Sequence, residues 1–137
     1  MEYNKPSPLT VWIVWIALFE SVFLYQFLIG GGIPTGEDQG EPDTYILVLG
    51  SVVAIVASLI RWLILPKAKN FQVMFTAFIV GMALSESIAI YGLFLIGEEN
   101  PESQLSFMVL SLLCMLQYTP VFAGKFGVEQ VDEGNGR

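Results

Sequence analysis

The sequence predicts an all-α integral membrane protein, a four-transmembrane-helix bundle built from two tandemly repeated helical hairpins. Three observations predict this fold class. Hydrophobic residues make up 54% of the 137 residues and form four blocks of about twenty, the length at which a helix crosses a bilayer. The basic residues all fall on one side of a four-span arrangement, and a polar motif occurs twice at matching positions.

Polar segments rich in glycine, proline and charge separate the four apolar blocks. We expect one transmembrane domain over residues 1–137, and a first span that is retained rather than cleaved as a signal peptide. A polar tail is expected to be loose. The predicted spans are 9–29, 45–65, 71–96 and 105–122, the first hairpin repeat is 9–65, the second is 71–122, and the tail is 126–137.

Charge placement predicts the orientation of the chain in the membrane. One side carries the basic residues Lys5, Arg61, Lys67, Lys69, Lys125 and Arg137. The other side carries only acidic charge, from Glu37, Asp38, Glu41, Asp43, Glu98, Glu99 and Glu102. Because basic segments stay in the cytoplasm, both termini are expected to be cytoplasmic (N-in, C-in). The expected location is the inner (plasma) membrane of a bacterium or archaeon.

Composition argues against several classes of function. The chain has no histidine and a single cysteine, Cys114, so neither a disulfide framework nor a histidine or cysteine-cluster metal site is expected. Its net charge of −7 argues against nucleic acid as a partner. No nucleophile–base pair can be recognised. We therefore expect no cofactor, no metal and no enzymatic activity.

An internal repeat relates residues 17–31 to residues 83–97. Identical polar residues at identical spacing are uncommon in apolar sequence, which favours duplication of a hairpin. Chance similarity between two leucine-rich helices is the alternative. The matched pairs include Glu20 with Glu86, Ser21 with Ser87, Tyr25 with Tyr91, and Gly31 with Gly97.

The two matched glutamates are predicted to lie near the middle of the membrane. Each comes eleven residues before its matched glycine, which is ~16 Å of helix. A carboxyl group at this depth must stay protonated or find a donor or cation, and so it is expected to face protein or a wet cavity. It either handles a proton or ion, or it fixes helix register through hydrogen bonds. The serines and tyrosines could complete a site only with a neighbouring helix or subunit.

The stretch ALSESIAIYGLFLI, residues 83–96, resembles the carboxylate-bearing helix of rotor-ring c subunits (proteolipids) of F-type and V-type ATPases. In that family the glutamate binds the transported proton or sodium ion, and a serine and a tyrosine help to complete the site. The resemblance implies ion-binding roles for Glu86, Ser87 and Tyr91, and for the repeated Glu20, Ser21 and Tyr25. The chain differs from the family in starting with a carboxylate helix and in lacking its glycine-rich inner helix.

Two functions are consistent with these features. The first is a small polytopic membrane protein that binds or translocates a proton, or another cation, in a c-subunit-like manner. The second is a non-catalytic accessory, scaffold or assembly protein in which the glutamates are structural. The expected partners are the lipid bilayer and either further copies of the chain or other membrane subunits.

Overall fold

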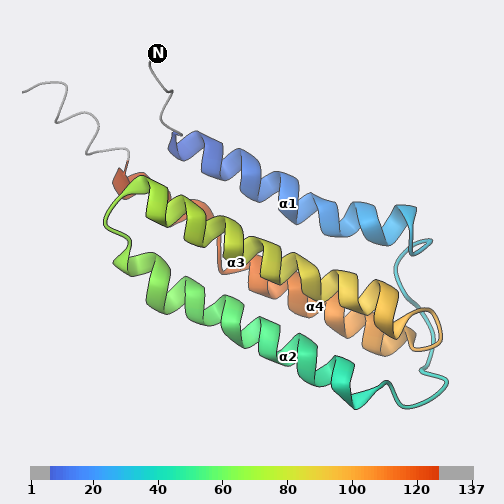
Figure 1. The fold of residues 1–137 in the computed structure, drawn as a ribbon. Helices are drawn as coiled ribbons and strands as arrows, with labels where there is room; N and C mark the ends of the chain where they lie inside the picture. Colours follow the sequence, from blue (N-terminus) through green and yellow to red (C-terminus); the bar gives the residue numbers. More distant parts are fainter. Residues whose placement is uncertain (1–6, 127–137) are drawn as a thin grey trace, which may run out of the picture.

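Residues 7–126 form an all-helical bundle in the computed structural model, which describes this part of the chain (Figure 1). The four long helices are α1 (Pro8–Leu28), α2 (Thr44–Leu59), α3 (Phe71–Tyr91) and α4 (Pro101–Leu116). Short π-helical and 3₁₀-helical turns continue them at Ile60–Ile64, Leu65–Lys67, Gly92–Ile96 and Pro120–Ala123. All four helical stretches are long and apolar enough to cross a membrane, and no strand occurs within residues 7–126.

The observed helices lie close to the predicted spans, with one clear difference in the fourth. This helix begins at Pro101 rather than near residue 105, because proline fits the first helical position, where no amide hydrogen is needed. It is also interrupted after Leu116, where Thr119 takes an extended ψ of 123° before Pro120. Phe126, placed in the tail by the sequence, is buried and packs edge-on against Phe71. Residues 127–137 lie outside the described part.

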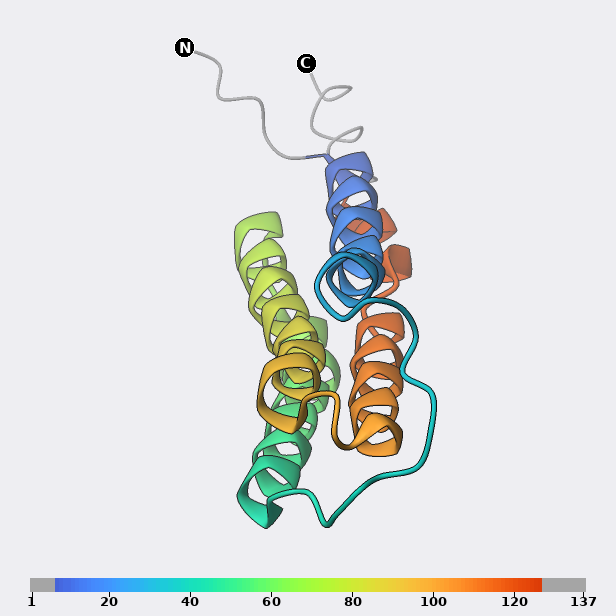
Figure 2. The same ribbon diagram turned by 90° about the vertical axis from the view of Figure 1, so that its right-hand side faces the viewer.

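Successive helices alternate in direction along the bundle (Figure 1). The start of α1, the link between α2 and α3, and the turn Pro120–Ala123 therefore lie at one end (Figure 1). Figure 2 shows the turn Pro120–Ala123 beside α1. The two acidic connections lie at the other end. This arrangement agrees with the even number of spans expected from the charges, while the side of the membrane on which each end lies stays a prediction.

Helix α3 is the central element of the bundle. It packs against α4 and α2 along much of its length and against α1 on a third side. Buried side chains of α3 and of the α4 end form the main core, which includes Met74, Phe78, Met82, Met115 and Tyr118. A second, smaller cluster joins α2, α3 and α4 toward the acidic end, around Ala54, Ile88, Ile96, Phe107 and Cys114.

Small residues allow the close approach of α2, α3 and α4. A β-carbon at Gly50 or Gly92 would overlap the ring or stem of Phe107. A β-carbon at Gly81 would overlap the hydroxyl group of Tyr118, which donates a hydrogen bond to the Ala57 carbonyl oxygen. The buried small residues of α2, Gly50, Ala54 and Ala57, thus serve tight helix packing, as small residues do at membrane helix interfaces.

The two hairpins are packed differently. Helices α3 and α4 lie side by side, whereas α1 and α2 lie on different sides of that pair (Figure 1). Local geometry nevertheless matches at the repeat: Gly31 and Gly97 both have a φ of 72°, a conformation that side chains disfavour. The duplication stays a prediction that this local match supports.

Asp38, in the connection between α1 and α2, caps the start of α4. Its carboxylate accepts hydrogen bonds from the amides of Glu102 (2.9 Å) and Ser103 (3.3 Å) and from the Ser103 hydroxyl (2.6 Å). These donors, led by the Ser103 hydroxyl, lower the pKa of Asp38, against a smaller opposing effect of burial. The long acidic connection is thereby fixed to the start of α4.

Replacing Gly81 by alanine should destabilise the bundle by about 1–3 kcal/mol, because the added methyl group displaces Tyr118 from Ala57. Reversible unfolding in mixed micelles would measure the loss. Gly124→Ala is the matched control, since its β-carbon meets nothing within 4 Å. Equal stability of the two variants would contradict the packing described.

Replacing Asp38 by alanine should speed hydrogen exchange at the amides of Glu102 and Ser103, with Glu41→Ala as the control. Because the folded-state pKa of Asp38 is lowered, the cap is fully present above the ordinary pKa of 3.8 and is lost as pH falls through the folded value. Protection that stays constant below that pH would show that the carboxylate is not the cap.

Candidate functional site

Glu86 of α3 meets Ser21 of α1. Ser21 Oγ lies 2.5 Å from Glu86 Oε1, and both side chains are half-buried. Glu86 comes ten residues before the end of the helical stretch at Ile96, about 15 Å along its axis. The pair therefore lies near the middle of the membrane-spanning part, at the place where an isolated carboxylate is most costly.

The Ser21 hydroxyl has two acceptors and only one hydrogen. Besides Glu86, it lies 2.6 Å from the carbonyl oxygen of Leu18 in its own helix. A protonated Glu86 could donate to Ser21 Oγ while the hydroxyl donates to Leu18; an ionised Glu86 could accept the hydroxyl hydrogen instead. A rotation of one hydroxyl hydrogen is enough to match either state of the carboxyl group.

The remaining candidate residues do not join this pair. Ser87 donates a 2.7 Å hydrogen bond to the carbonyl oxygen of Leu84, the same local bond that Ser21 makes to Leu18. Tyr91 packs against the smaller core cluster on the side of α2 and α4. Glu20 and Tyr25 are exposed on the surface of α1. The structure thus brings together Glu86 and Ser21 of the six predicted site residues.

A second hydrogen bond ties α1 to the bundle nearer its start. Trp15 Nε1 donates to the carbonyl oxygen of Met115 at 3.0 Å, at the place where α4 nears its break. Trp15 also stacks on Phe19, with ring centroids 5.1 Å apart. Because they join α1 to α4 and to α3, the Trp15 and Ser21 bonds fix its rotation and its height on these two helices.

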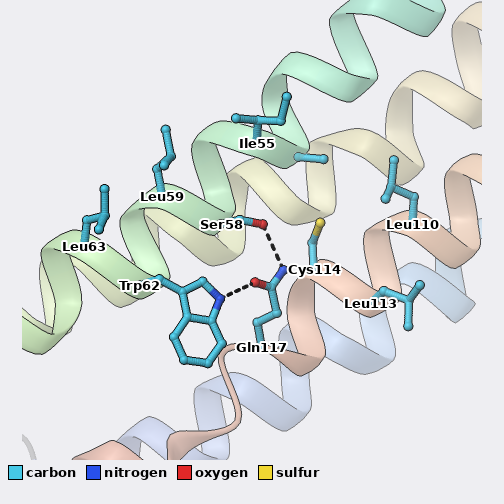
Figure 3. Close-up of a pocket in the computed structure, with 10 residues that line it drawn as sticks. Ile55, Ser58, Leu59, Trp62, Leu63, Leu110, Leu113, Cys114 and Gln117 are labelled. Atoms are coloured by element: carbon cyan, nitrogen blue, oxygen red, sulfur yellow. Dashed lines mark hydrogen bonds between the residues drawn. The ribbon is translucent and has the colours of Figure 1, made fainter.

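A polar network joins α2 and α4 at the basic end of the bundle. The side chain of Gln117 accepts from Trp62 Nε1 at 2.9 Å and donates to Ser58 at 3.1 Å (Figure 3). Arg61 donates to the Gln117 carbonyl oxygen and lies over the rings of Trp62 and Phe122. The π-helical turn Ile60–Ile64 carries both Arg61 and Trp62, a helix defect that hydropathy does not signal.

Beside this network, an apolar groove of about 410 Å³ opens between α2 and α4. Its walls are mainly aliphatic, with Ile55, Leu59 and Leu63 on one side and Leu110 and Leu113 on the other (Figure 3). In a membrane, lipid chains fill such a surface without a specific site being required.

Neither the groove nor the pair of Ser21 and Glu86 has the composition of a metal centre. Within residues 7–126, no group of three or more histidine, cysteine or acidic side chains is placed to hold a metal ion. Comparison of the chain with known protein families, with curated proteins and with solved structures found no match.

Removing the Ser21–Glu86 bond should weaken the docking of α1 by about 0.5–2 kcal/mol, the range for hydrogen bonds between membrane helices. A double-mutant cycle with Ser21→Ala and Glu86→Ala, read by unfolding in mixed micelles, would measure the coupling. The matched control is Ser87→Ala, because the Ser87 hydroxyl bonds within α3 and to no other helix within residues 7–126 of the same chain. Coupling no larger for Ser21 than for Ser87 would contradict the pairing.

Proposed function

We propose that this chain is a small membrane protein that binds and releases a proton at Glu86, in a manner like that of rotor-ring c subunits. The contact between Glu86 and Ser21 is the observation that carries the proposal. The chain would work without catalysing a covalent reaction, as a homo-oligomer or beside other membrane subunits, with both termini in the cytoplasm.

Three properties of the pair support proton binding. The carboxyl group is half-buried, so it is not sealed inside the bundle. Its depth makes the neutral state favourable, because charge in the bilayer centre is costly. Its partner hydroxyl can donate or accept as the protonation state requires, so Ser21 stabilises both states of Glu86.

The proposed site differs from the one implied by the family resemblance. The serine that meets Glu86 comes from the other repeat, whereas Ser87 bonds within its own helix. Tyr91 lies on a different side of α3. The proposal therefore assigns the positioning role to Ser21, and it takes the proton as the ion because one carboxyl group and one hydroxyl are sufficient to hold it.

A structural role for the glutamates is the second candidate, for an accessory, scaffold or assembly protein. One observation favours it: the Ser21–Glu86 bond is one of the hydrogen bonds that hold α1 on the bundle, together with that of Trp15. In this case Glu86 would stay protonated over the whole pH range in which the protein is folded.

A carbodiimide that attacks protonated buried carboxyl groups should label Glu86 in the reconstituted protein, and labelling should fall as pH rises. Glu86→Gln should remain folded and lose the label, because the amide keeps a hydrogen bond to Ser21. Ser21→Ala should shift the pH dependence, while Ser87→Ala, the matched control, should leave it unchanged. Labelling of Glu86 that does not change with pH would favour the structural role.

A further inference from the structure

Glu20 is left uncovered by the rest of the chain. It lies on the exposed face of α1, eight residues and about 12 Å of helix before Leu28. Its carboxyl group takes part in none of the side-chain hydrogen bonds found within residues 7–126. Its neighbours on this face are apolar, among them Ile16 (46% exposed) and Leu24 (56% exposed). A carboxyl group at this depth is expected to face protein, so the face requires a partner.

Helix α3 offers a second uncovered face at the same depth. Its sides toward α1, α2 and α4 are packed, while Val80, Ala83 and Phe94 are exposed on the remaining side. Ser87 lies on this side and is half-buried, with its hydroxyl bonded only to Leu84 of its own helix. Ser87 thus makes the same local bond as Ser21, without the contact to a second helix that Glu86 gives to Ser21.

We propose that a second copy of the chain covers both faces, with Ser87 of each copy contacting Glu20 of the other. The contact within one copy is the template, because the repeat pairs Ser21 with Ser87 and Glu86 with Glu20. Within one copy, Ser21 of α1 contacts Glu86 of α3. Between the copies, Ser87 of α3 would contact Glu20 of α1. Each carboxyl group of the repeat then has a serine partner.

Helix geometry makes this arrangement close on itself. Adjacent residues point about 100° apart around a helix, so the serine and the glutamate of each repeat define two contact directions at that angle. Helices α1 and α3 run in the same direction, so the angle has the same sense on both (Figure 1). Helices joined at interior angles of about 100° close after four to five members, and α1 and α3 of two copies supply roughly that number.

The residues at the centre of this four-helix group fit its geometry. Ala17 lies three residues before Glu20 and four before Ser21, so it faces between the two contacts, toward the axis. Ala83 has the same relation to Glu86 and Ser87. Both alanines are exposed within one copy, and small residues there let membrane helices approach closely. Helices α2 and α4 lie on the opposite side of α3, outside the group.

A second copy fits these faces better than a different partner does. All copies share one orientation in the membrane, so a twofold axis along the membrane normal puts Glu20 and Ser87 at closely similar depths. Each copy presents one carboxyl group and one serine, so two equivalent contacts form and neither face is left over. This inference deepens the proposed function through the same repeat, but its test does not depend on proton binding.

Cross-linking in lipid bilayers tests the arrangement directly. In a Cys114→Ala background, Ala17→Cys and Ala83→Cys should each form disulfide-linked dimers on mild oxidation, because the two copies of each residue face one another across the axis. Val52→Cys, on the exposed surface of α2, is the control and should give few. Equal cross-linking at Val52, or none at Ala17 and Ala83, would overturn the proposal.

Variants at the contact itself give the second readout. Glu20→Ala should weaken dimerisation by about tenfold, as loss of two membrane hydrogen bonds predicts, while Glu20→Gln should largely keep it. Ser87→Ala should resemble Glu20→Ala, as measured by native mass spectrometry from nanodiscs. Ser51→Ala, which removes only a bond to Leu47 within α2, is the matched control and should leave the dimer intact. A monomeric wild type, or a dimer indifferent to Glu20 and Ser87, would overturn the inference. The pH-dependent labelling of Glu86 would stand or fail separately.

Discussion

The cost of placing a carboxyl group in hydrocarbon is the constraint on which this structure depends. Water cannot solvate such a group there, so a protein partner must, and for Glu86 that partner is the hydroxyl of Ser21. The bond fixes how α1 is rotated on α3, and thereby which face of α1 is left outside. The exposed position of Glu20 follows from it, because Glu20 is the residue next to Ser21.

The rest of the bundle supports this contact by making α3 a fixed reference. Glycines at positions 81 and 92 bring α4 against α3, and Tyr118 reaches across to the α2 backbone. At the basic end, Gln117 joins α2 to α4 through Trp62 and Ser58. At the acidic end, Asp38 fixes the long connection to the start of α4. Helices α1 and α2 are the least buried of the four. The hydrogen bonds of Trp15 and Ser21 define the position of α1 on the bundle.

The sequence predicts the four long apolar helices, because a bilayer demands helices of this length and composition. It also predicts that Glu86 needs a neighbouring helix, since its own serine and tyrosine point elsewhere. It does not predict that Ser21 is the partner of Glu86, because the spacing of hydrophobic residues does not determine which helices pack against each other. The sequence does not predict the cap by Asp38, because the cap depends on a contact distant in sequence. It does not predict the π-helical turn at Arg61, because this turn is a local defect of the backbone.

The protonation of Glu86 tests the central claim most directly. Solid-state NMR of the protein in bilayers, with ¹³C-labelled glutamate and Glu86→Gln for assignment, would follow its carboxyl carbon as pH changes. The account predicts a titration within the pH range in which the bundle stays folded, displaced in Ser21→Ala and unchanged in Ser87→Ala. A carboxyl carbon that keeps one shift throughout, or that ignores the loss of Ser21, would contradict it.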